Sequence, residues 1–231
     1  MRGAKSLLGC GLVLAVAGCA SDDGGQMAWQ ESTATIRSVI GSAQWSIGGG
    51  LWLPARPNMI MPEGTTIQTG ADSAVDMQVN GHTSTVRLTS NTTMTLSTMK
   101  ALGEDSETVL DVKVGTILGS VRKLSKNSKY EVKNTRGMCG IRGTDFVVQV
   151  VPQDSGVPLV TYTCVTGQLL CVIHLIINGV PTDVPRTLNT GQTWTPPETA
   201  YGGSQTKPFE NPAPILKLFE NNRPGTPIAV P

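Results

Sequence analysis

The stretch that decides the fold is TRGMCGIRGTDFVVQVV, residues 135–151. It joins a turn punctuated by glycines to a strand in which Phe146, Val148 and Val150 share one face, because strand side chains alternate with period two. Gly143 stands before Thr144, which indicates a backbone of positive φ or the close approach of a neighbouring strand. Phe146 is one of only three phenylalanines in the chain, so we expect it at the centre of the core.

Alternating apolar and polar residues continue outward from this stretch. The clearest case is Val75, Met77 and Val79, after which Asn80-Gly81 signals a tight hairpin turn. About ten short runs of this kind, at spacings of roughly 8 to 12 residues, predict an all-β fold. The fold class is a compact sandwich or a short solenoid-like stack, since no exact internal repeat is present. Charged residues make up only 15% of the chain, which suits many short strands joined by turns.

Arg142-Gly143-Thr144-x-Phe146, followed by a valine-rich strand, resembles the RGT-x-F signature of FecR-type domains, which occur in bacterial envelope proteins. Further motifs of the family stand around it in the familiar order: Gly64-x-x-Ile67-x-Thr69-Gly70, Val112-x-Val114-Gly115, Val165-x-Gly167 and Leu188-x-x-Gly191-Gln192. The resemblance covers roughly residues 34 to 194. The chain departs from it at Thr166, where the family often has an acidic residue, and in the two cysteines that flank this turn.

The first nineteen residues are predicted to be a signal peptide. Arg2 and Lys5 precede an apolar core, Leu7 to Val16, that is too short for a bilayer, which needs roughly 20 apolar residues. Val16-Ala17-Gly18-Cys19 resembles the lipobox of bacterial lipoproteins, which implies acylation of Cys19 and cleavage before it. The alternative is an ordinary secretory signal cut at a small-residue site.

The expected mature chain has three parts. Residues 20–33 are polar and predict a flexible tether. Residues 34–194 are the all-β domain. Residues 195–231 contain eight prolines and predict an irregular tail, either packed on the domain or free to bind a partner. Ala20, rather than aspartate, follows Cys19, which by resemblance to known sorting signals implies an outer-membrane lipoprotein facing the periplasm.

Besides Cys19, the mature chain has three cysteines, Cys139, Cys164 and Cys171. An oxidising periplasm permits one disulfide, and three pairings are possible. If Gly167-Gln168 forms the turn of a hairpin, Cys164 lies opposite Cys171 at a Cα separation of roughly 5 Å, which a disulfide can bridge. Cys164–Cys171 is therefore the predicted pair and Cys139 a buried free thiol, with Cys139–Cys164 as the competing bond.

A basic segment stands out in a chain of formal net charge +1. Eight basic residues and one acid, Glu131, fall within residues 113–142. One interpretation is contact with lipid phosphates or acidic polysaccharide, where each cation near an anionic surface contributes about 1 kcal/mol. The other is a solvated hairpin whose charges protect an edge strand. The candidate anionic-ligand patch is Arg122, Lys123, Lys126, Lys129, Lys133 and Arg136; Arg142 is considered separately, as a residue that pairs with Asp145 or a carbonyl to hold the turn.

Catalytic patterns are weak. His82 and His174 have no metal-ligand spacing, and no metal site or cofactor is predicted. Ser120-x-x-Lys123 matches the Ser-Lys hydrolase pattern by letters, but it falls at the end of an expected strand instead of a helix start. The acidic residues around Glu104 lack a calcium-loop spacing and indicate a solvated loop. A hydrolase or sugar-active enzyme therefore has no convincing residue set.

The sequence thus predicts a non-enzymatic, lipid-anchored periplasmic module that binds or scaffolds an envelope component, either a protein or an anionic glycan or lipid. Nucleic acid is disfavoured by the compartment and by the lack of aromatic residues among the basic ones. The resemblance also implies an alternative. Well-known members of the family pass an iron-uptake signal to a cytoplasmic sigma factor through a cytoplasmic segment and an inner-membrane helix. Neither is expected in this chain, so it could act only as a periplasmic relay in envelope signal transduction.

Overall fold

The computed structural model describes residues 28–80, 84–177, 180–197 and 207–208. This part of the chain consists of strands and turns, so the all-β prediction is confirmed, and it contains no helix with the length and apolar character that a bilayer crossing needs. The predicted signal peptide, Cys19, and most of the predicted tether and tail lie outside it. The strands are β1 (Gln30–Glu31), β2 (Thr33–Ile40), β3 (Ala43–Ile47), β4 (Leu53–Pro54), β5 (Ile60–Pro62), β6 (Thr65–Thr69), β7 (Ala74–Val79), β8 (Ser84–Leu88), β9 (Thr93–Leu102), β10 (Asp105–Val121), β11 (Lys129–Asn134), β12 (Gly137–Ile141), β13 (Asp145–Val151), β14 (Leu159–Thr166), β15 (Gln168–Ile177), β16 (Val180–Asn189), β17 (Gln192–Trp194) and β18 (Lys207–Pro208).

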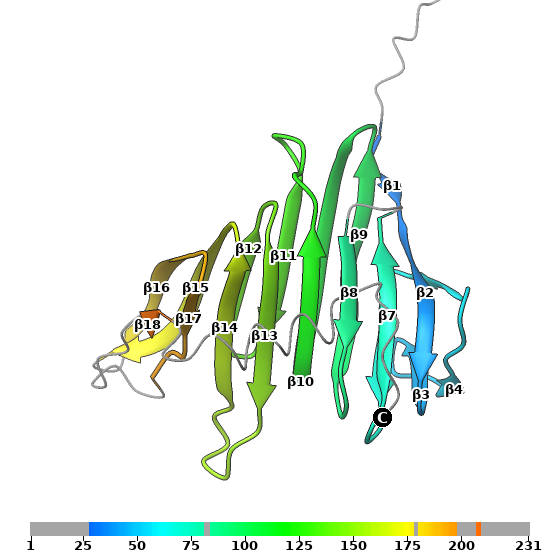
Figure 1. Ribbon diagram of the computed structural model, residues 1–231, viewed down its shortest axis with the longest axis horizontal. Helices are drawn as coiled ribbons and strands as arrows, with labels where there is room; N and C mark the ends of the chain where they lie inside the picture. The colour runs from blue at the N-terminus through cyan, green and yellow to red at the C-terminus, as the bar shows by residue number, and fades with distance from the viewer. Residues whose placement is uncertain (1–27, 81–83, 178–179, 198–206, 209–231) are drawn as a thin grey trace, which may run out of the picture.

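The strands form two sheets that share β10. Sheet A has the order β4, β3, β6, β9, β10, β11, β12, β15, β16, with β1 on the far end of β9. Sheet B has the order β5, β2, β7, β8, β10, β13, β14, β17, β18. Neighbours are antiparallel except β10 and β11, which are parallel. Consecutive hairpins alternate between the sheets, so the chain advances along a stack with β2, β3 and β4 at one end and β15, β16 and β18 at the other (Figure 1).

Strand β10 belongs to both layers because it changes sheets at Gly115. Its first half pairs with β9, whereas the residues from Gly115 onward pair with β8 and β13. Gly115 has a φ of 96°, and a Cβ there would lie 2.3 Å from Oγ1 of Thr92. Only glycine fits this crossing without strain.

A single main core fills the space between the sheets. Phe146 is fully buried, as expected, and its ring lies over Gly119 of the neighbouring strand β10. A Cβ at Gly119 would lie 2.2 Å from Cε1 of this ring. At the C-terminal end of the stack, Tyr162 and Trp194 are buried with ring centroids 6.1 Å apart.

Polar groups are also buried, on the opposite face of sheet B. Asp76 of β7 stands directly opposite Arg87 of β8, in a row of the sheet that alternates with the core-facing rows. The Arg87 Nε and Nη2 groups both donate to the Asp76 carboxylate at 2.5 Å, and the Ser38 hydroxyl donates to it at 3.0 Å. Such paired geometry makes burial of two charges tolerable.

The expected hairpin between residues 75–79 and 84–88 is present, with Val79 opposite Ser84. The expected hairpin around Gly167-Gln168 was wrong. Strand β14 pairs with β13 and β17 in sheet B, and β15 pairs with β12 and β16 in sheet A. The chain crosses between layers at Gly167, so the two strands flanking this turn do not face each other as partners.

Candidate functional site

The pairing of the cysteines follows from the crossing of the chain between the two sheets at Gly167. Cys139 stands directly opposite Cys171 in the β12–β15 pair, and the two form a disulfide. Cys164 lies in the other sheet, where it is buried and free. The predicted Cys164–Cys171 pair is therefore corrected to Cys139–Cys171, because the register that favoured it belonged to a hairpin that does not form.

The signature turn is the crossing from β12 to β13. Gly143 has a positive φ of 63°, as predicted. The buried Thr144 donates from its Oγ1 to the Gln168 carbonyl at 2.9 Å, and its own carbonyl accepts from the Val121 amide at 3.0 Å. The turn thus fastens the two places where the chain changes sheets, and Thr144 acts as a structural tie rather than a ligand group.

Arg142 has a different place from these buried signature residues. Its side chain is exposed, and no hydrogen bond or ion pair joins its guanidinium to Asp145 or any other residue of the described ranges. The adjacent Gly143 packs near Lys123, whose Cα would lie 3.5 Å from a Cβ on that glycine. Arg142 and the exposed loop residues Arg122, Lys123 and Lys126 are called the basic edge below.

The loop of the basic edge is fixed by Asp105 at the start of β10. The Ser125 hydroxyl donates to one carboxylate oxygen at 2.5 Å, and the Asn127 amide donates to the other at 3.1 Å. The hydrogen bond from Ser125, and to a smaller extent that from Asn127, lowers the pKa of the Asp105 carboxyl. The loop is therefore held by its own polar residues, which leaves its cations directed to solvent.

The other three residues of the predicted patch do not extend this edge. The Lys129 ammonium lies 3.2 Å from Glu131 and 3.9 Å from Glu107. Lys133 stands beside Asp111 in the register of β10 and β11. Arg136 is only 8% exposed and donates from Nη2 to the Pro197 carbonyl at 2.5 Å, so it is removed from the surface patch.

The weak catalytic patterns gain no support. Ser120 donates to the Asp145 carboxylate at 2.7 Å, across the β10–β13 pair, instead of meeting Lys123. His174 Nδ1 lies 2.5 Å from the Asp183 carboxylate on the exposed edge formed with β16. His82 lies outside the described residues. Within the described ranges, no three His, Cys, Asp or Glu side chains are grouped to hold a metal ion.

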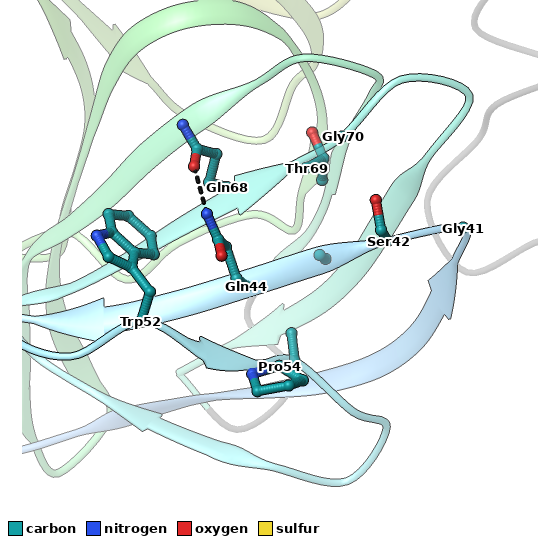
Figure 2. A pocket seen from close by; sticks show the side chains of 10 residues that line it. Gly41, Ser42, Gln44, Trp52, Pro54, Gln68, Thr69 and Gly70 are labelled. Atoms are coloured by element: carbon teal, nitrogen blue, oxygen red, sulfur yellow. Dashed lines mark hydrogen bonds between the residues drawn. The ribbon is translucent and has the colours of Figure 1, made fainter.

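A pocket of about 630 Å³ lies at the N-terminal end of the stack, beside β3, β4 and β6. Figure 2 shows the indole of Trp52 next to the side chains of Gln44 and Gln68, which come from neighbouring strands. The Gln44 Nε2 group donates to Oε1 of Gln68 at 2.8 Å, and Gln68 Nε2 donates to the Thr93 hydroxyl at 3.3 Å. The lining residues are Gly41, Ser42, Ala43, Gln44, Trp52, Pro54, Ala55, Gln68, Thr69 and Gly70.

No local pattern in the sequence indicates this pocket. Trp52 stands between a triple glycine and Pro54, in a segment whose only local signal is that of a loop. The amides that accompany it come from β3 and from β6, and only the strand pairing brings them together. The available signal was a tryptophan between Leu51 and Leu53 in a loop bounded by glycines and Pro54, because a large apolar ring outside a strand has no obvious core partner.

The fold and the crossing turn define an all-β domain in which hairpins feed two sheets alternately. Residues 65–168 match the family model described as FecR protein, a region that runs from β6 to the first residue of β15 and contains the signature turn. No curated protein matches the chain.

Two crystal structures of a "putative anti-sigma factor" from Parabacteroides distasonis ATCC 8503 have a similar fold. The one at 2.50 Å resolution has a TM-score of 0.51 and the one at 1.65 Å a TM-score of 0.50, each at 13% sequence identity. Both comparisons cover 66% of this chain, which spans 63% and 64% of the two compared chains. At this identity the likeness concerns the fold.

Proposed function

We propose that this protein is a non-catalytic binding module of the bacterial envelope, anchored by a lipid on Cys19 and facing the periplasm from the outer membrane. The observation that supports this most directly is the match of residues 65–168 to the FecR protein family. The region that matches is a rigid stack, because its crossing turns are tied by Thr144 and its sheets share β10. A rigid stack presents surface loops in fixed positions, as binding modules require.

The basic edge is the surface through which this module would meet an anionic envelope component, such as an acidic polysaccharide, a lipid headgroup or a protein. Its four cations are exposed, and Asp105 holds the loop that carries three of them. Clustered exposed cations attract an anionic partner and make its binding sensitive to salt. Binding through such charge contacts does not require catalytic residues.

The anchor is tested by mass spectrometry of the mature N-terminus together with fractionation of the envelope. We expect acyl chains on Cys19 and recovery with the outer membrane, both lost in a Cys19→Ala variant. A mature protein that begins elsewhere, carries no acyl mass and fractionates as a free periplasmic protein would contradict the anchored role.

The binding role is tested by chemical crosslinking in envelopes, followed by purification of the full chain. A variant with Arg122→Gln, Lys123→Gln and Arg142→Gln should lose most of the partner captured by the wild type, because it removes three cations of the basic edge. A variant with Lys129→Gln and Lys133→Gln is the control, since the Lys129 ammonium lies near Glu107 and Glu131, and Lys133 stands opposite Asp111 in the strand register. Equal capture by both variants would argue against the basic edge.

A periplasmic relay in envelope signal transduction is the second candidate. It is supported by the fold that the chain shares with the "putative anti-sigma factor" structures. Deletion of the gene should then change the abundance of a defined set of transcripts, and restoring the chain should reverse the change. Transcript levels that stay the same under envelope stress would count against the relay.

A further inference from the structure

The pocket at the N-terminal end has the size and lining of a small-ligand site. Its volume of about 630 Å³ falls within the range of roughly 300 to 1,000 Å³ that is common for such sites. None of its ten lining residues carries a charged side chain. The pocket therefore offers an aromatic face, two amides and two hydroxyl side chains, but no counter-charge for an ionic ligand.

Trp52 supplies the aromatic face. Trp52 is 39% exposed although the residues that follow it are fixed, by pairing of Leu53 with Trp45 and by the hydrogen bond from the Ala55 amide to the Ala43 carbonyl at 2.9 Å. An indole that is fixed in place and half-exposed presents an apolar face to water, which a flat ligand can cover. The C–H face of a pyranose ring is apolar and of matching width.

Gln44 supplies the polar contacts. One of its amide N–H groups is used on Gln68, which leaves the second N–H and the carbonyl Oε1 of this pocket-lining residue available for a ligand. Within the described ranges no other residue bonds to this amide. One donor and one acceptor on the same planar group fit two neighbouring hydroxyls of a sugar, each of which both donates and accepts.

The floor of the pocket is already rigid, so little ordering is required on binding. The Thr69 hydroxyl donates to the Thr89 carbonyl at 2.6 Å, and the Gly70 amide donates to the Ser42 carbonyl at 2.9 Å. Gln68 is held between Gln44 and Thr93. Prepositioned groups reduce the entropic cost of binding.

From this arrangement we infer that the pocket binds a neutral carbohydrate chain, with one sugar ring stacked on Trp52 and its hydroxyls bonded to Gln44. The inference gives a ligand class to the binding role proposed above and rests on it. The ligand is distinct from the anionic component assigned to the basic edge, because the pocket lining has no cation. A protein that is acylated and envelope-bound but ignores sugars would overturn only this inference.

The test uses the full chain, purified in detergent, and two neutral probes, the tetrasaccharides of β-1,4-linked glucose and of β-1,4-linked N-acetylglucosamine. Tetragalacturonic acid is the anionic comparison. Saturation-transfer NMR and calorimetric titration should show binding of at least one neutral probe, with transfer strongest to the C–H groups of one ring. The anionic probe should bind at least tenfold more weakly.

Variants locate the site. Trp52→Ala and Gln44→Ala should each weaken binding about tenfold or more. Trp29→Ala and Gln149→Ala are the matched controls, since Trp29 is 46% exposed and Gln149 is exposed on β13, and they should change the affinity less than twofold. Circular dichroism checks that all four variants fold.

Three results would overturn the inference. The first is the absence of saturation transfer to both neutral probes at millimolar concentration. The second is neutral-sugar binding that persists within twofold in the Trp52→Ala variant. The third is binding of the anionic tetrasaccharide that equals or exceeds that of the neutral ones.

Discussion

At the scale of single residues, Gly119 sets the position of the central ring. The Phe146 ring occupies the space that the side chain of any other residue at position 119 would need, because a Cβ there would lie 2.2 Å from ring atom Cε1. We predict that Gly119→Ala lowers the free energy of unfolding by about 2 kcal/mol or more, because the added methyl group must displace a fully buried phenylalanine. Urea denaturation followed by circular dichroism measures the change.

The matched control for Gly119 is Gly140→Ala. A Cβ at Gly140 would meet its nearest neighbour, the Leu170 carbonyl oxygen, at 3.7 Å, which is ordinary contact. This variant should stay within about 1 kcal/mol of the wild type. Equal destabilisation by both substitutions would mean that the loss at Gly119 does not come from the room that the Phe146 ring needs.

The buried pair of Arg87 and Asp76 should contribute strongly to the stability of the protein. Arg87→Met should destabilise the protein by about 3 to 5 kcal/mol, because it leaves the Asp76 carboxylate buried without its bidentate partner. The additional change Asp76→Leu should restore most of the loss, since the pair is then replaced by apolar groups. Thermal and urea unfolding report both values.

An exposed pair offers the comparison. The Lys113 ammonium lies 2.6 Å from the Asp111 carboxylate, and its side chain is 52% exposed. Because water and salt screen such a pair, Lys113→Met should cost at most about 1 kcal/mol. If Arg87→Met were as mild as Lys113→Met, burial would not be what makes the Arg87–Asp76 pair important.

At the scale of elements, the disulfide joins β12 to β15, and Cys164 stands alone in β14. Burial raises the pKa of the Cys164 thiol to about 11. Since the thiolate is the reactive form, we predict that iodoacetamide at pH 8 leaves Cys164 of the native protein nearly unmodified and labels it after unfolding in urea. Peptide mapping without reduction should then recover Cys139 linked to Cys171.

Two further outcomes follow for the same elements. Cys139→Ser should lower the free energy of unfolding by about 2 to 4 kcal/mol by releasing a cross-link over 32 positions of the sequence.

The raised pKa of Cys164 favours the folded state below about pH 9, and this stability is lost as the pH rises toward 11. A Cys164→Ala variant should show a smaller loss over that range. Rapid labelling of native Cys164, or a peptide joining Cys164 to Cys171, would contradict the placement of β14 and β15 in separate sheets.

The element scale also shows what the sequence could predict. Alternation placed Val75, Met77 and Phe146 on core-facing rows, because period two is a local property of a strand. It could not decide whether Gly167 turns the chain back into the same sheet or across to the other one. That choice depends on Thr144, whose hydroxyl reaches Gln168 from 24 positions away, and on β12 as the partner of β15.

Of the residues in the candidate sites, too, the sequence could indicate some but not others. Local sequence was enough to mark Arg122, Lys123 and Lys126, since they follow one another in a single loop. It could not reveal that Arg136 is buried against Pro197, or that Gln68 stands beside Gln44 in a pocket, because both facts depend on strand pairing. Pairings between distant segments are the information that a periodic pattern lacks.

At the scale of the whole molecule, β10 couples the two ends of the stack. Its first half is central in sheet A and its second half in sheet B, so unfolding either layer removes a neighbour from the other. The stacked hairpins could otherwise melt separately, as units of repeat proteins do when their interfaces are weak. The shared strand therefore predicts one cooperative transition.

Trp45 in β3 and Trp194 in β17 report on opposite ends of the stack, and variants that keep one of them and replace the other three tryptophans by phenylalanine separate their signals. We predict that urea midpoints from Trp45 fluorescence, Trp194 fluorescence and far-ultraviolet circular dichroism coincide. Gly115→Ala should lower all three by the same amount, because its Cβ would strike Thr92 where β10 changes sheets, at a cost of about 3 kcal/mol. Separate midpoints for the two tryptophans, or a Gly115→Ala effect confined to one of them, would show that the ends of the stack fold independently and that β10 does not unite them.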